Sequence, residues 1–492
     1  MIRYVRNFVL ALIYYSLQAY VYTPPFHFIW IFLSVVLGSL LMSVSLEVLF
    51  KVIKDNHGNF LCPEGMAVLG FILYFLCAPF VMFERYNLDV SERLYGVSAS
   101  DFTQLGPTFT LSILGLFLFW VAFTIGLFWT RLKKTGREEQ QSLDVYRDKM
   151  KQAKHGFRSY MIAGLLFYFL GIAVVWLWLG GIFNWLSATI SSFIARGQGV
   201  RFVGQSGYGY IEIINKFADV GIIIFIIILY LIFRNKLARP IIWVIGFVLS
   251  FLAYGYIGSR TAVLIVILWL LIIHSMLIKP IKFKNFVLLG FVIVFLALFM
   301  NSVSHFANIG QRPGSIVDLL TYTINASAVT FVAGIDLSRV LPTVVMFKHS
   351  LQGDITLGST FIASLLHPLP NYVWPFSRPL NIEQFAAWKA EIDPYGHRSH
   401  PIIGMPGEAF INFSWFGVML IGFVLGLITS YCQKFYNMFV QYGNIASGVI
   451  AVILSVFTFT ITATQSFILF YQLVILAITI IGFLFVTKIK WK

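Results

Sequence analysis

Cysteine and charge are both scarce in this sequence of 492 residues. The three cysteines, Cys62, Cys77 and Cys432, cannot build a disulfide framework and do not have the spacing of a zinc site. This excludes a small domain stabilised by disulfides or by zinc. Only 11% of the residues are charged and 59% are hydrophobic, far from the balance of a soluble globular chain. The sequence shows no internal repeat, low-complexity tract or domain linker, so residues 1–492 are predicted to form a single domain.

Long apolar runs make up most of the chain, and the mean hydropathy is +0.84. Each run is long enough to cross a hydrocarbon core about 30 Å thick. Backbone groups in lipid must form hydrogen bonds within their own segment, so each run is predicted to be a helix. The sequence therefore predicts an all-α integral membrane protein with about 12 transmembrane helices. The predicted spans lie near residues 5–22, 28–46, 66–83, 108–130, 159–186, 217–233, 240–256, 261–278, 284–301, 414–433, 444–460 and 465–487.

Lysine and arginine are unevenly distributed between the predicted loops. With the amino terminus in the cytoplasm, 23 of the 35 Lys and Arg residues fall on the inner side and 12 on the outer side. This is the positive-inside pattern, so both termini are predicted to be cytoplasmic. The excess positive charge then faces anionic lipid, and the basic pI does not indicate a nucleic-acid partner. The inner loop 131–158 carries both signs of charge, which favours a solvated helix at the headgroups.

Two predicted outer segments contain arginines of interest, one in a glycine-rich loop and one at the start of an apolar span. The predicted outer loop 187–216 contains Arg196 and Arg201 among glycines, which allow a backbone to bend close to a ligand. Arg260 stands alone at the outer mouth of an otherwise apolar span. A forked, permanently charged guanidinium suits pyrophosphate better than an ammonium does, so these arginines are candidate diphosphate ligands. The alternatives are a turn whose arginines touch lipid headgroups, and a snorkelling Arg260.

The longest outer loop, residues 302–413 between the ninth and tenth predicted helices, is expected to be partly helical. Its last part gathers six ionisable side chains beside glycines and prolines: Glu391, Asp393, His397, Arg398, His400 and Glu408. A histidine accepts a proton near neutral pH, and a carboxylate can orient it or act as the base itself. Three aromatic side chains of the loop are available to stack on sugar faces or to pack beneath it: Trp374, Trp388 and Tyr395. No metal site is predicted, because two carboxylates alone are weak evidence for one.

Three pieces of the sequence carry a resemblance to a known family. In the first, Arg196 is followed by ten residues and Gly207, and in the second, Gly258-Ser259-Arg260 opens a span. The third reads Gly407-Glu408-Ala409-Phe410-Ile411-Asn412-Phe413 and runs into Trp415-Phe416-Gly417. In these features the chain resembles the O-antigen polymerases, the Wzy family of bacterial surface polysaccharide assembly. Family members often read Asn-Phe-Gly in the third piece, where this chain has Ser414 in place of that glycine.

The resemblance implies a GT-C-like glycosyltransferase of the bacterial inner membrane, with a periplasmic active site and no cofactor. Such an enzyme transfers a glycan from undecaprenyl pyrophosphate to the next lipid-linked repeat unit, in O-antigen and lipopolysaccharide biosynthesis or that of a similar surface polysaccharide. The pyrophosphate would be bound by Arg196, Arg201, Arg260 and Arg398. Arg260 would also act in catalysis by stabilising the departing charge. His400 or Glu408 would take the proton of the acceptor hydroxyl. The sugars would be held by Trp374, Trp388 and Tyr395. A protein that regulates chain length is an expected partner.

Two other readings of the sequence stay open. One is an O-antigen ligase, in whose family a histidine lies upstream of a similar segment, or another polyprenyl-linked glycosyltransferase. Many such transferases place a catalytic carboxylate in the first outer loop, but here the loop 22–26 is short and has no acid. The other is a secondary transporter or flippase, which matches the helix count. Transporters of that size usually divide into two equal halves, whereas here the longest loops follow the fourth and ninth spans.

Overall fold

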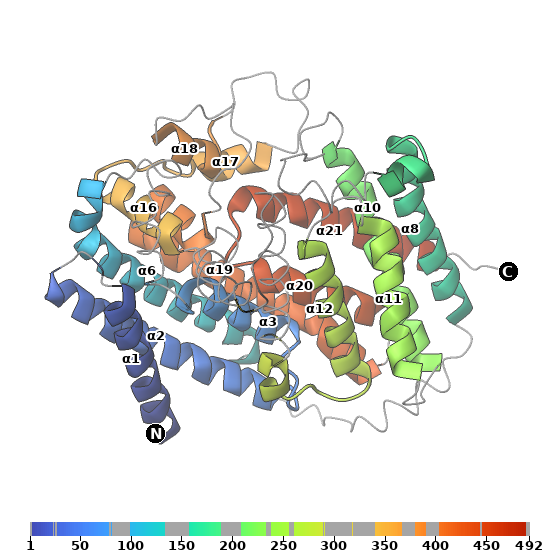
Figure 1. Ribbon diagram of the computed structural model, residues 1–492, viewed down its shortest axis with the longest axis horizontal. Helices are drawn as coiled ribbons and strands as arrows, with labels where there is room; N and C mark the ends of the chain where they lie inside the picture. The colour runs from blue at the N-terminus through green and yellow to red at the C-terminus, as the bar shows by residue number, and fades with distance from the viewer. Residues whose placement is uncertain are drawn as a thin grey trace.

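The apolar runs of the sequence form helices in the computed structural model (Figure 1). Among the described residues there is no strand, and five helices are long and apolar enough to cross a bilayer. These properties are compatible with an all-α membrane protein, while the full number of twelve spans stays a prediction. The structure describes residues 2–22, 24, 27–77, 80, 99–132, 157–187, 208–232, 238–254, 260–288, 290, 317, 340–366, 379–389, 403–442 and 445–488.

The helices have the following bounds: α1 Ile2–Tyr22, α2 Phe28–Asp55, α3 Pro63–Phe71 continued by a π-helix Ile72–Leu76, α6 Ala99–Leu132, α8 Phe157–Trp178, α10 Tyr208–Ile232, α11 Ala238–Tyr254, α12 Arg260–Leu277, α16 Val340–Leu351, α17 Ser359–Leu366, α18 Ile382–Lys389, α19 Met405–Tyr442, α20 Ile445–Thr460 and α21 Ser466–Lys488. The helix α19 begins at Met405, nine residues before the predicted span, and is interrupted at Phe413 and Ser414, so the predicted start near residue 414 coincides with the part of α19 after this interruption. The helices α6 and α10 also begin nine residues before their predicted spans. Most of the predicted span 284–301 lies outside the described residues.

The long helices α6 and α19 pack with their backbones in contact. A Cβ atom on Gly422 would lie 2.5 Å from the carbonyl oxygen of Phe119, and one on Gly426 would lie 2.1 Å from that of Phe123. Both distances are too short for any side chain. Small residues four positions apart allow two membrane helices to approach closely, so these glycines fix how α6 and α19 cross.

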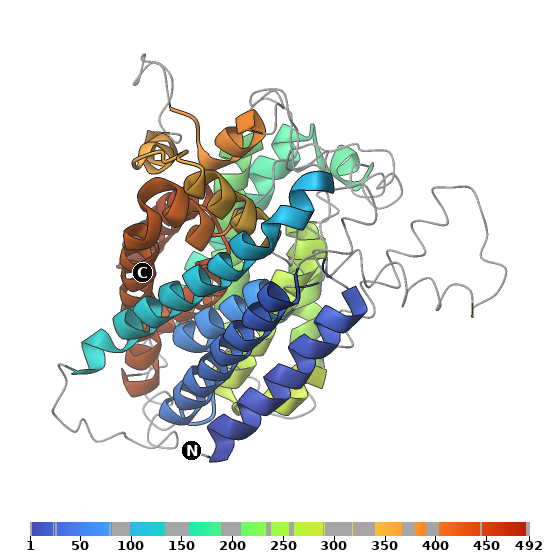
Figure 2. The ribbon, with the colours of Figure 1, turned by 90° about the vertical axis from the view of Figure 1, so that its left-hand side faces the viewer.

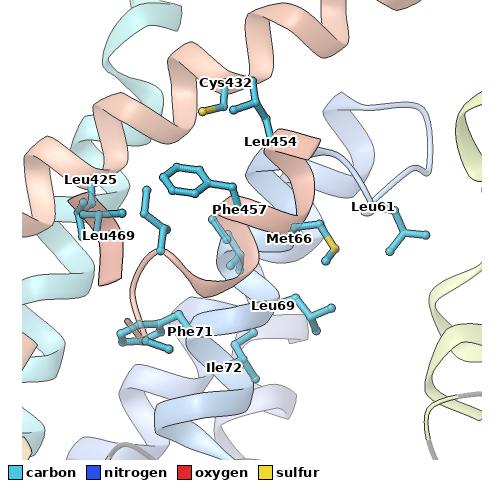
Figure 3. Packing of buried hydrophobic residues seen from close by; sticks show 14 of the residues in the cluster. Leu61, Met66, Leu69, Phe71, Ile72, Leu425, Cys432, Leu454, Phe457 and Leu469 are labelled. Atoms are coloured by element: carbon cyan, nitrogen blue, oxygen red, sulfur yellow. The ribbon is translucent and has the colours of Figure 1, made fainter. Parts of the chain in front are cut away.

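The short helix α3 lies at the centre of the bundle, where every one of its residues is buried. Figure 3 shows Met66 and Leu69 of α3 in one apolar layer with Phe457 of α20. A Cβ atom on Gly70 would lie only 1.9 Å from the carbonyl oxygen of Phe459, so the backbones of α3 and α20 also touch. Apart from Glu64 in its first turn, α3 has no charged or polar side chain, as expected of a helix that other helices surround.

Buried amides and hydroxyls join the last turns of α12 and α19 to the turn after α2. Asn59 Nδ2 donates to the hydroxyl of Tyr436 at 2.7 Å, and the hydroxyl of Ser275 donates to Asn59 Oδ1 at 2.8 Å. Gln433 Nε2 donates to Asn56 Oδ1 at 2.9 Å. Buried polar groups are costly unless they are hydrogen-bonded, so this network holds one end of the bundle in register. We call it the Asn59 end.

The helices α10, α12 and α19 run in the same direction. Ser275, near the end of α12, and Tyr436, near the end of α19, both contact Asn59. Near the end of α10, the hydroxyl oxygen of Tyr230 lies 3.4 Å from Nδ1 of His274 on α12. The starts of these three helices therefore lie toward the opposite end, away from the amino terminus, where the short orange helices α16, α17 and α18 also lie (Figure 1, Figure 2).

Candidate functional site

Glu408 lies in the first turn of α19, and its side chain is fully buried. Thr360 of α17 donates its hydroxyl to Glu408 Oε1 at 3.0 Å. Ser466, the first residue of α21, donates its backbone N–H to Oε2 at 2.6 Å and its hydroxyl to Oε1. Ser364 Oγ lies 2.7 Å from the hydroxyl oxygen of Ser466. Because three donors satisfy the buried carboxyl group, Glu408 joins the starts of α19 and α21 to α17.

Asn412, one turn after Glu408, extends the same set of hydrogen bonds. Its Nδ2 donates to the carbonyl oxygen of Glu408 and to Oγ1 of Thr360, both at 2.7 Å. Its Oδ1 accepts a hydrogen bond of 2.8 Å from the hydroxyl of Thr356, which precedes α17. We refer to the connected side chains as the Glu408 cluster, and to this end of the bundle as the Glu408 end. The cluster consists of Thr360, Ser364, Glu408, Asn412 and Ser466.

The helix α19 bends directly after the Glu408 cluster. Phe413 has φ −139°, and Ser414 has φ 53° and ψ −145°, so neither residue is helical. Glycine adopts such a positive φ without strain, whereas serine does not.

The chain just before α19 is tied to the turn between α20 and α21. The backbone N–H of Ile403 donates to Gln465 Oε1 at 3.1 Å. The backbone N–H of Met405 donates to the carbonyl oxygen of Thr462 at 3.2 Å. Since Ile403 follows His400 by three positions in the sequence, the point where the ionisable segment joins the bundle is fixed at the Glu408 end.

Three of the segments that the sequence singled out lead into helices that begin toward the Glu408 end. Arg196 and Arg201 precede α10, which begins at Tyr208, inside the predicted loop 187–216. Arg260 is the first residue of α12, and His400 precedes α19 by five positions in the sequence. The lysines near the end of α2 and just after α12 lie toward the Asn59 end, at the opposite side of the bundle. They are Lys51, Lys54, Lys279, Lys282 and Lys284. The direction of the helices therefore separates the arginine- and histidine-bearing segments from these lysines.

The structure places some of the predicted site residues. Glu408 is buried as described, and Arg260 is the first residue of α12, in agreement with the predicted helix opening. Trp388 on α18 is half exposed, with its ring centroid 6.0 Å from that of Phe385. The side chain of Arg260 lies outside the described part of the structure. The other predicted residues do so entirely: Arg196, Arg201, Trp374, Tyr395, Arg398 and His400.

Sequence reasoning missed the partners of Glu408. Thr360 and Ser364 are hydroxyl residues four positions apart in a stretch without charge, and Ser466 is the second residue of the predicted span 465–487. Such a spacing places both hydroxyls on one helix face, and polar side chains within apolar helices usually face other protein groups. This signal marks the residues as inward-facing, but it does not identify the helix that they meet.

The cluster has the character of a positioning element. Both oxygens of Glu408 accept hydrogen bonds from protein donors, and the side chain has no exposed surface. A group in this state holds helix starts in place and has no free face for a substrate. Among the described residues, no group of three or more His, Cys, Asp or Glu side chains could hold a metal ion.

Comparisons of this chain with known protein families, with curated proteins and with solved structures give no match.

Proposed function

We propose that this chain is a polysaccharide polymerase of the bacterial inner membrane that joins undecaprenyl-pyrophosphate-linked repeat units at the periplasmic face. The observation that carries the proposal is the common direction of α10, α12 and α19. It supports the proposal because the segments with Arg196 and Arg201, with Arg260 and with His400 adjoin, in the sequence, the starts of three helices that begin toward the Glu408 end. An enzyme that separates a glycan from a diphosphate needs fixed positive charge and a base at one place.

The proposed orientation has the Glu408 end in the periplasm and the Asn59 end in the cytoplasm. The lysines near the Asn59 end follow the positive-inside pattern that also places both termini in the cytoplasm. The twelve-span, GT-C-like arrangement is part of the same proposal. Five long apolar helices and several shorter ones support it.

The proposed reaction is a single transfer of a glycan chain. The acceptor hydroxyl attacks the anomeric carbon of the donor, the bond from that carbon to the pyrophosphate oxygen breaks, and undecaprenyl pyrophosphate departs with its electron pair. His400 accepts the proton of the hydroxyl. Arg196, Arg201, Arg260 and Arg398 stabilise the negative charge that develops on the leaving diphosphate.

Glu408 has a positioning role in this proposal. Its carboxyl group holds the start of α19 against α17 and α21, and thereby fixes where the segment with His400 joins the bundle. Holding a base within reach of a bound hydroxyl accelerates reaction through orientation. Trp388 has an exposed ring and is suited to stack on a sugar, a role also proposed for Trp374 and Tyr395.

The proposal is tested by incubating the purified protein with undecaprenyl-pyrophosphate-linked repeat units and EDTA, without nucleotide sugar. A ladder of products spaced by one repeat unit is the expected result. If competent substrate gives no ladder, the polymerase assignment is wrong. Transfer of glycan to a lipid A core in place of chain growth would indicate a ligase, and uptake of intact substrate into vesicles would indicate a transporter or flippase.

Variants at Arg260 and His400 test the residue assignments. Arg260→Ala and His400→Ala are expected to give no polymer while the protein stays in the membrane. Arg260→Lys keeps the positive charge but loses the forked geometry, and it should lose much of the activity for that reason. Full activity of Arg260→Lys would show that Arg260 does not bind the diphosphate through its forked guanidinium and only extends its charge to the membrane surface. Normal polymer from His400→Ala would exclude His400 as the base.

A further inference from the structure

The short helix α17 buries two hydroxyl side chains together with Ala363 and exposes two of its largest apolar side chains. Thr360 and Ser364 are buried and belong to the Glu408 cluster. Ile362 and Leu365, three positions apart and so on one face, are 52% and 54% exposed. A helix at a protein–water boundary shows the reverse arrangement, with its apolar face turned toward the core.

The stretch around α17 contains no charged residue from Ile355 to Leu366. Leu357, just before the helix, is 78% exposed and has a φ of 49°, which is costly for a side chain of this kind. The turn is held by backbone hydrogen bonds, of which one of 3.0 Å runs from the N–H of Thr356 to the carbonyl oxygen of Ile411. The fold therefore fixes Leu357 outward, in a position that water would disfavour.

The outer face of α17 is continuous with the exposed face of α19. The ring of Phe361 on α17 stacks on that of Phe413 at the bend of α19, with centroids 6.1 Å apart. Beyond the bend, α19 exposes Phe416 and Leu420, at 66% and 42%, along a helix long and apolar enough to cross a bilayer. One apolar strip thus runs from the proposed membrane span onto α17.

We propose that α17 and Leu357 are immersed in the bilayer leaflet at the Glu408 end, where phospholipid acyl chains cover Leu357, Ile362 and Leu365. The inverted pattern of α17, the charge-free stretch and the strip shared with α19 all fit hydrocarbon as the neighbour. The segment lies within the loop 302–413, which the sequence predicted outside the membrane. The Glu408 cluster then lies on the protein side of a lipid-facing helix. The inference depends on the membrane class of the chain and not on the proposed reaction.

Photolabelling of the unmodified protein tests this placement. The protein is reconstituted as single copies in phosphatidylglycerol–phosphatidylethanolamine nanodiscs and irradiated with a diazirine carried on a phospholipid acyl chain, or separately with a water-soluble diazirine. Peptides that cover residues 355–366 are expected to carry at least tenfold more lipid-borne than water-soluble label. Gln352, exposed in the turn after α16, provides the internal control and should show the opposite preference.

Spin labels at single cysteines provide a second measurement at residue resolution. Ile362→Cys and Leu365→Cys are compared with Gln352→Cys in a background where Cys62, Cys77 and Cys432 are replaced by Ala. Labels at the two α17 positions should collide more often with oxygen than with a water-soluble nickel chelate, and the label at position 352 should do the reverse. Preferential collision with the chelate at positions 362 and 365 would overturn the proposal. Protection from both reagents would also overturn it, because protein would then cover the face.

Discussion

Replacing Glu408 with Ala tests whether the carboxyl group holds three helices together. The change removes the carboxylate oxygen that accepts from the Ser466 N–H. Leaving this buried donor without a partner costs about 1–3 kcal/mol of the free energy of unfolding. Truncation of a buried side chain to Ala costs about 2–5 kcal/mol through the cavity that it leaves. The hydroxyl of Ser466 can still pair with Ser364, whereas Thr360 keeps only the bond that it accepts from Asn412. We therefore expect a net loss of about 3–5 kcal/mol.

Glu408→Gln is the matched control, because an amide can replace every hydrogen bond of the carboxyl group. Its carbonyl oxygen accepts from the Ser466 N–H, and its NH₂ group donates to the hydroxyls of Thr360 and Ser466, which can both accept. We therefore expect Glu408→Gln to lose no more than about 1 kcal/mol. In the proposed positioning role this variant also keeps most of the polymerase activity. A stable but inactive Glu408→Gln protein would instead indicate that Glu408 itself exchanges a proton.

The native cysteines provide the assay. Cys62 and Cys432 are 0% and 7% exposed, so a thiol-reactive dye labels them only when the bundle opens. In a Cys77→Ala background, a loss of about 3 kcal/mol corresponds to labelling more than about a hundredfold faster. If Glu408→Ala labels at the rate of the unmodified protein, the carboxyl group does not hold the helix starts, and the reasoning is wrong.

Three further predictions follow from the packing of the bundle, two read by the same labelling assay and one by the yield of folded protein. Ser414→Gly relieves a positive φ at the bend of α19 and should slow labelling, with a gain of about 1 kcal/mol; faster labelling would contradict the strain argument. Gly426→Ala places a Cβ atom 2.1 Å from a backbone oxygen of α6 and should prevent folding, whereas Gly482→Ala, with its nearest neighbour at 3.6 Å, should fold normally. Equal yields of the two would show that α6 and α19 do not depend on this contact. Gln433→Leu removes a buried amide that bonds Asn56, Asn437 and the N–H of Glu64, and should cost about 2–4 kcal/mol; labelling at the unmodified rate would show that the network is dispensable.

Much of the helical organisation follows from the sequence, because apolar runs in lipid have few alternatives to the helix. The start of α19 was not predictable in this way. Glu408 and Asn412 interrupt the apolar run, so the sequence placed them in a loop, whereas in the structure they lie in a short helical segment before the bend at Phe413 and Ser414. Partners from α17 and α21 satisfy these polar groups, and a single sequence does not show which distant segments will meet.

The candidate site was predictable to a similar extent. The motif around Glu408 drew attention to a residue that the structure buries in a hydrogen-bonded cluster, and Arg260 opens a helix as expected. The partners Thr360 and Ser466 lie 48 and 58 positions from Glu408 in the sequence, so only tertiary packing brings them together. The bend at Ser414 was also missed, since serine gives no local signal for a positive φ.

The hydrogen bonds that hold the start of α19 against its neighbours determine which positions can be substituted during evolution. Ile403, Met405 and Ser466 all contribute backbone N–H groups, which any residue except proline would supply. Substitutions at positions 403 and 405 can therefore accumulate without loss of these contacts, while a few side chains must stay. A search for distant relatives should weight Glu408, Asn412 and the paired hydroxyls of α17 and α21 above the apolar residues that surround them.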